Sequence, residues 1–199
     1  LWHVELGLAE SVPGPIVIGD GRYLGLGLMA PVQDAVGILS FAIADGLARQ
    51  AEPLELTRAL RRSVMARVQR ALGERATLPT FFSGHDPDGA KARSGSHRHL
   101  AFAFDAPRSR LLVLAPHLLE GRQASESERV YLRTRAGALE DFRELRAGRA
   151  GRLSLVTENL AMQDDPLFAR STAWKSLTPY IVTRHAKAGN AAAAIEADL

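Results

Sequence analysis

The sequence predicts an α+β fold with an antiparallel sheet. Hydrophobic periodicity indicates the order helix–strand–strand–helix–strand after residue 50, and a four-residue turn separates the two consecutive strands. Such a short turn joins antiparallel strands, because a parallel pair needs a much longer crossover. The chain has 199 residues, 46% of them apolar and 24% charged, which is the composition of a globular domain with its own core.

The first predicted helix begins at Pro53, since proline is favoured in the first turn of a helix. Its apolar residues recur every four positions and form one stripe: Leu56, Leu60, Val64, Val68 and Leu72. Four arginines lie off this stripe: Arg58, Arg61, Arg62 and Arg70. The stripe is therefore expected in the core and the arginines on the surface, where the sequence alone assigns them no role.

The next two segments predict a β-hairpin. Residues 97–105 alternate, with Leu100, Phe102 and Phe104 on one face, and residues 106–109 contain the proline of a turn. Residues 110–115 are more continuously apolar and are expected to form the returning strand. A second helix is predicted over 125–146, stopped at Gly148, and a further strand over 152–157.

The N-terminal part is harder to assign. Residues 2–8 alternate and predict a strand, and the apolar residues 16–18 lead into a glycine-rich loop. Residues 31–50 are mixed and are expected to be helical in part. The chain starts without methionine and stops just after a helical-looking run, so we expect a fragment of a longer protein.

Several classes of protein are excluded by composition. The chain has no cysteine, which excludes disulfide scaffolds, zinc ribbons, iron–sulfur sites and thiol nucleophiles. No run approaches the roughly 18 apolar residues of a membrane helix, and no signal peptide is recognisable. We therefore expect a cytoplasmic protein with no membrane partner and no cofactor.

The basic residues are almost all arginine: 22 of 25, against three lysines. Guanidinium groups make bidentate contacts with phosphates and stack on bases, which an ammonium does not do. GC-rich codon usage explains the same bias without any function. The net charge is only +3, so the chain is not a general polycation.

A glycine-dense loop spans residues 19–27. Its members of interest are Gly19, Gly21, Arg22, Gly25 and Gly27. It is neither a dinucleotide fingerprint nor a P-loop, because no G-x-G-x-x-G opens a helix and the P-loop lysine and hydroxyl are missing. Glycines let the N–H groups of the protein backbone come close to a ligand, and together with one arginine this suits binding of a sugar–phosphate chain. The alternative is a purely structural turn.

Three of the six histidines, His85, His97 and His99, fall within fifteen residues. A neutral imidazole can take the proton of a ribose 2′-hydroxyl while an imidazolium protonates the leaving 5′-oxygen. We therefore interpret His85 and His99 as a candidate acid–base pair, with His97 as the alternate. The alternatives are that these histidines brace the loop or, less simply, bind zinc.

The C-terminal part mixes aromatic and basic residues: Trp174, Lys175, Tyr180, Arg184 and His185. Such mixtures stack bases and hold phosphates of single-stranded RNA. Trp174, Lys175 and Arg184 are thus candidate RNA-binding residues. Trp174 and Tyr180 fit a buried face equally well.

Four stretches together resemble a known family: GPIVIGDGRYLGLGLM (14–29), SGHDPDG (83–89), HRHLAF (97–102) and WKSLTPY (174–180) with the later Arg184 and His185. In this order they are similar to the fused "Cas five/Cas six" subunit of type I-U (I-G) CRISPR effector complexes, within the RAMP superfamily. Members are longer, and a second glycine loop expected after the C-terminal helix is missing here.

The resemblance implies a ferredoxin-like (RRM-like) fold, with residues 1–50 ending a first RAMP module and 51–199 forming part of a second. It also implies binding of CRISPR repeat or guide RNA, metal-independent cleavage of the repeat, and association with other effector subunits. Two alternatives stay open. The first is a non-catalytic scaffold that holds the 5′ handle of the guide RNA. The second is an unrelated metabolic enzyme with a histidine-lined pocket.

Overall fold

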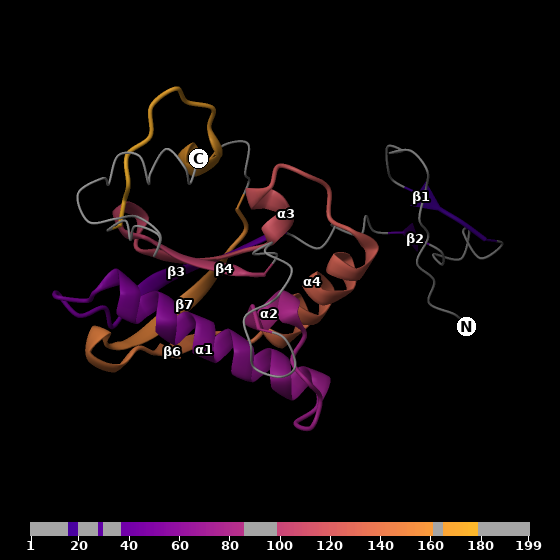
Figure 1. The fold of residues 1–199 in the computed structure, drawn as a ribbon, viewed down its shortest axis with the longest axis horizontal. Helices are drawn as coiled ribbons and strands as arrows, with labels where there is room; N and C mark the ends of the chain where they lie inside the picture. Colours follow the sequence, from indigo (N-terminus) through magenta and orange to yellow (C-terminus); the bar gives the residue numbers. More distant parts are fainter. Residues whose placement is uncertain (1–15, 20–27, 30–36, 86–98, 161–164, 179–199) are drawn as a thin grey trace. The chain divides into compact units, whose positions relative to one another are not determined.

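A curled five-stranded antiparallel sheet organises most of the described chain (Figure 1). The computed structural model describes residues 16–19, 28–29, 37–85, 99–160 and 165–178. The strands follow the order β4-β5-β3-β7-β6 across the sheet, and each neighbouring pair is antiparallel. Their bounds are β3 Ile38–Asp45, β4 Ala101–Asp105, β5 Arg110–Leu114, β6 Glu144–Arg146 and β7 Arg152–Glu158.

Two long helices alternate with these strands along the chain. The first, α1, separates β3 from β4, and the second, α4, separates β5 from the β6–β7 hairpin. The order is therefore β-α-β-β-α-β with β6 added beside the last strand. The helix bounds are α1 Pro53–Leu72, α2 Thr80–Ser83, α3 Pro116–Leu119 and α4 Glu126–Ala138, with short 3-10 turns η2 Ala106–Arg108, η3 Gly148–Ala150 and η4 Pro166–Phe168.

The predicted first helix is confirmed as α1. Pro53 lies in its first turn, and four residues of the predicted stripe are fully buried: Leu56, Leu60, Val64 and Val68. This stripe packs against α4 and against β4. Burial of so many apolar side chains, rather than helix propensity alone, holds α1 in place.

The predicted hairpin is also found, as β4, η2 and β5, although β4 begins at Ala101 rather than at residue 97; residues 97–98 lie outside the described residues. Asp105 pairs with Arg110 across the turn, which closes at Ser109 with a φ of 48°. One face of the sheet is apolar and faces the helices: Phe41 of β3 meets the ring of Phe142, which follows α4, edge-on at 5.2 Å between ring centroids. The core therefore lies between this face and α1.

The second predicted helix is partly wrong. α4 begins with a capping box in which Ser125 and Glu128 exchange hydrogen bonds, but it ends at Ala138, and residues 144–146 form β6. The helical spacing of Leu139, Phe142 and Leu145 explains the over-extension, because all three are buried in a turn and a strand rather than in a helix.

The expectation of helix within residues 31–50 is wrong for residues 38–45, which form β3. Ile38 and Phe41 are buried on opposite faces of the sheet. Apart from Ser40 and Asp45, β3 is apolar on both faces, so it lacks the alternation that reveals a strand.

The chain divides into two units, Leu1–Ala35 and Val36–Leu199. In the first, β1 (Ile16–Val17) pairs antiparallel with β2 (Leu28–Met29). Residues 2–8 lie outside the described residues. We predicted a division near residue 50, whereas β3 belongs with the larger unit. Within the described ranges no helix is long and apolar enough to cross a membrane.

Candidate functional site

His85 and His99 are brought together where α2 ends. Gly84 closes this helix in the left-handed conformation, with a φ of 70°. A Cβ placed on Gly84 would lie 2.9 Å from Cδ2 of His99, so the imidazole ring of His99 lies against the backbone of Gly84. His85 is the next residue. The fold therefore places the ring of His99 against the residue that precedes His85, although a loop separates the two histidines in sequence.

Hydrogen bonds fix the backbone around this pair. The hydroxyl of Ser83 accepts from the backbone N–H of His85 at 3.1 Å, and Phe81 accepts from the N–H of Leu100 at 2.9 Å. The end of α2 and the residues that lead into β4 are thus joined directly. This joining holds His99 beside the turn that carries His85.

The two histidines have different surroundings. His99 is half-buried, and its Nδ1 lies 2.9 Å from the carbonyl oxygen of Leu100. A carbonyl only accepts hydrogen bonds, so Nδ1 carries the proton in this contact and Nε2 is the basic nitrogen of the neutral ring. His85 is exposed to solvent. One ring is thus oriented by the protein and the other is exposed.

A positive charge lies at the same place. The guanidinium of Arg61, on α1, donates a hydrogen bond to the carbonyl oxygen of Ser83. Arg61 is half-buried, so its charge is held close to the turn that carries His85. A cation beside an acid–base pair is the group that would stabilise negative charge developing on a phosphate. The periodicity of α1 indicated that Arg61 is on the surface but did not indicate this contact.

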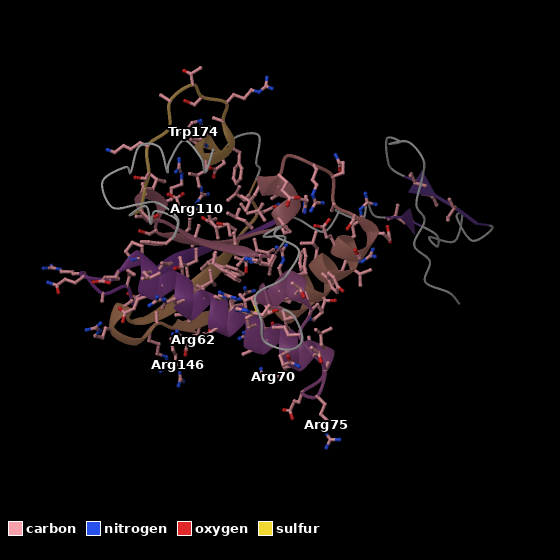
Figure 2. The ribbon with its side chains drawn as sticks, viewed as in Figure 1. Arg62, Arg70, Arg75, Arg110, Arg146 and Trp174 are labelled. Atoms are coloured by element: carbon pink, nitrogen blue, oxygen red, sulfur yellow. The ribbon has the colours of Figure 1, made fainter. Side chains whose placement is uncertain are left out.

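The other predicted residues are distributed as follows. Gly19 has a φ of 84° and open space around the position of a Cβ, which fits a turn. Lys175 is exposed and Trp174 is 69% exposed, so Trp174 is not a core residue in this structure (Figure 2). The remaining candidates lie outside the described residues: Gly21, Arg22, Gly25, Gly27, His97 and Arg184.

A zinc site that includes His97 is not tested, because His97 is among those residues. Within the parts of the chain that are described, no three histidine, aspartate or glutamate side chains gather as metal ligands would. The pair of His85 and His99 beside Arg61 contains the groups needed for proton transfer and charge stabilisation.

Sequence reasoning missed a buried ion-pair cluster centred on Arg110 of β5. Arg110 is 4% exposed and donates from Nε to Asp105 at 2.8 Å and from Nη1 to Asp165 at 2.6 Å. The hydrogen bond from Arg110 lowers the pKa of the Asp165 carboxyl. This cluster ties the segment that carries Trp174 and Lys175 to the sheet. The only sequence feature that could have indicated this cluster is a single arginine at the start of an otherwise apolar strand.

His117 was also missed. It lies on α3, is 8% exposed, and has a pKa lowered by its burial. A Cβ on Gly37 would lie 2.7 Å from its Nε2, so the ring fills the space beside that glycine. Near it, Arg122 forms a bidentate pair with Glu128 at 2.6 and 2.7 Å, which supports the start of α4. His117 therefore serves packing rather than the candidate site.

Comparison of the chain with protein-family models, curated proteins and solved structures finds no match.

Proposed function

We propose that this chain binds RNA and cleaves it without a metal ion, as the repeat-processing subunit of a CRISPR effector complex. The observation that carries the proposal is that the His99 ring lies against Gly84, the residue before His85, while Arg61 donates to the carbonyl oxygen of Ser83 in the same turn. Acid, base and a cation are the three groups that cleavage by a ribose 2′-hydroxyl needs.

The proposed reaction uses both histidines. Nε2 of neutral His99 takes the proton of the 2′-hydroxyl, and the resulting oxygen attacks the adjacent phosphorus. The bond from phosphorus to the 5′-oxygen breaks, and imidazolium at His85 donates a proton to that leaving oxygen. The products are a 2′,3′-cyclic phosphate and a 5′-hydroxyl. Arg61 stabilises the additional negative charge on the phosphorane.

The arrangement of the sheet supports the same proposal. A β-α-β-β-α-β chain with its first strand central, between the third and the fourth, is the strand order of a ferredoxin-like domain, and β3, β5, β7 and β4 occupy these positions. The resemblance of residues 83–89 and 97–102 to the RAMP family adds a second, independent line of support. Both residue ranges contribute to the candidate site.

The test is incubation of labelled repeat RNA with the full chain in EDTA, followed by analysis of the product ends. We expect cleavage that leaves a cyclic phosphate and a 5′-hydroxyl. Cleavage that requires a divalent metal would overturn the proposed chemistry. RNA binding without cleavage would select the scaffold that holds the guide RNA 5′ handle, and the absence of both would select the unrelated metabolic enzyme.

A further inference from the structure

α1 carries far more positive than negative charge. Its twenty residues contain five arginines and a single acidic residue, Glu55. The arginines are Arg58, Arg61, Arg62, Arg67 and Arg70. A solvated helix face is more often built from opposite charges three or four positions apart, because such pairs stabilise the helix. The charge on α1 is therefore unusual for a face that only contacts water.

Three of these arginines, Arg58, Arg62 and Arg70, are exposed. Within the described residues none of the three guanidinium groups has a hydrogen bond or an ion pair. Other surface arginines of the same domain do have acidic neighbours: Arg146 and Arg152 contact Glu144, and Arg149 contacts Glu55. Arg49, Arg75 and Arg170 are also exposed without a described acidic neighbour, but only α1 carries three such arginines on one element.

We call these three arginines the α1 ridge (Arg58, Arg62 and Arg70). Arg58 and Arg62 are four positions apart and are separated by about 6 Å along the axis, and Arg70 lies eight positions, or about 12 Å, further on. Figure 2 shows Arg62 and Arg70 following one another along α1, with Arg75 beyond its end. Like charges at this spacing repel, and a bound polyanion would relieve that repulsion.

A hollow lies at the end of the ridge. It has a volume of about 200 Å³ and is lined by Arg67, Arg70, Ala71 and Ala138. The guanidinium of Arg67 lies 5.0 Å from the centre of the Phe142 ring, and this contact orients its planar donor group. Two arginines beside a small open hollow make an arrangement that suits a phosphate.

We propose that the α1 ridge and the hollow beside it form a binding surface for the phosphates of one RNA strand. Arginine without lysine favours phosphate, because its planar fork donates two parallel hydrogen bonds. Arg61, next to Arg62 in the same helix, reaches the turn that carries His85, so a strand on the ridge passes close to the candidate site. The identity of the polyanion rests on the proposed function.

The test compares two double variants of the full chain that remove equal charge. Arg62→Ala/Arg70→Ala removes two ridge arginines. Arg129→Ala/Arg146→Ala is the control, because these arginines lie 4.0 Å from Glu126 and 3.2 Å from Glu144. The affinity for a labelled single-stranded RNA is measured over a range of salt concentrations, and melting temperatures are recorded in parallel.

We expect the ridge variant to bind RNA about ten-fold more weakly, with a log–log salt slope flatter by about 1.4, and the control to bind like the unaltered chain. Arg62→Lys/Arg70→Lys should keep the salt slope and lose only a few-fold in affinity, since the charge remains and the bidentate contact is lost. An equal loss in the ridge variant and the control would overturn the proposal.

The outcomes for the ridge and for catalysis are separable. RNA binding that depends on the ridge, without any cleavage, would support the ridge and overturn the proposed chemistry. If the ridge variant cleaves RNA and binds it as tightly as the unaltered chain, the proposed chemistry is supported and the ridge proposal is overturned. Polyglutamate of matched length is the second probe, and binding of polyglutamate as tight as that of RNA would identify an acidic protein partner and overturn the RNA assignment.

Discussion

Arg110 and Asp165 are joined by a hydrogen bond of 2.6 Å, from Nη1 of the guanidinium to Oδ2 of the carboxylate. Arg110 opens β5, and Asp165 caps the 3-10 turn η4 by accepting from the N–H of Leu167 at 2.9 Å. Asp105 holds the other side of the same guanidinium. The bond between Arg110 and Asp165 therefore anchors the segment of residues 165–178 to the sheet.

The first prediction follows from that bond. Asp165→Asn should lower the free energy of unfolding by about 1–3 kcal/mol, because the buried guanidinium of Arg110 loses a charged hydrogen-bond partner. It should also accelerate hydrogen exchange within residues 165–178. Asp141→Asn is the control, since Asp141 is exposed and has no described partner. Similar exchange in both variants would mean that Asp165 does not anchor the segment.

A second prediction concerns Gly84. Gly84→Ala places a Cβ 2.9 Å from the His99 ring in a backbone conformation that non-glycine residues rarely adopt. Gly73→Ala is the matched control, because Gly73 has a φ of 102° but nothing within 4 Å of the Cβ position. Both should lose about 1 kcal/mol of stability. Only Gly84→Ala should also reduce RNA cleavage, by about ten-fold or more through displacement of the His99 ring. Equal cleavage by the two variants would contradict this.

The histidines themselves provide a third prediction. His85→Ala and His99→Ala should each reduce cleavage by about 10²-fold or more, while RNA binding stays within a few-fold, because only proton transfer is removed. Cleavage rates under single-turnover conditions measure the effect. His97→Ala tests the alternate, and a large loss there with normal cleavage by His85→Ala would reassign the acid to His97.

Only the features of this fold that local sequence determines were predictable. The burial of Leu56 and Leu60 and the pairing of Asp105 with Arg110 were predictable, because each depends on local periodicity or on a short turn. β3 was not, since a strand buried on both faces has no period. The contact of His99 with Gly84 was not predictable either: it depends on how α2 meets the start of β4, which no spacing encodes. The same holds for the ion pair of Arg110 with Asp165.

The fourth prediction is a dependence of stability on pH. Burial lowers the pKa of His117, so the unfolded chain binds a proton that the folded chain does not. Above the unfolded pKa of about 6.5 the imidazole is neutral in both states and burial has no pH-dependent cost. Below it the unfolded chain is protonated first, so the free energy of unfolding falls as the pH drops. His117→Gln should remove this part of the decline. Urea midpoints between pH 8 and pH 5 measure it, and an identical decline in the variant would exclude His117 as the cause.

At lower pH a second group contributes. The hydrogen bonds from Arg122 lower the pKa of Glu128 to about 2, so its contribution to stability is present above the unfolded pKa and is lost as the pH falls toward 2. We expect Glu128→Gln to be less stable than the unaltered chain at pH 7 and to approach it in acid. A constant difference between pH 7 and pH 3 would contradict the assignment.

The last prediction concerns Trp174, whose side chain is 69% exposed. An exposed indole is available to stack on a base, and stacking contributes about 1–3 kcal/mol for each base without neutralising any phosphate. Trp174→Ala should therefore weaken binding of single-stranded RNA while leaving both the salt slope and the melting temperature unchanged. Lys175→Ala is the informative neighbour, because the loss of a phosphate contact should flatten the slope by about 0.7. A fall in melting temperature for Trp174→Ala, without a specific loss of binding, would show that this tryptophan packs in the folded chain and does not hold RNA.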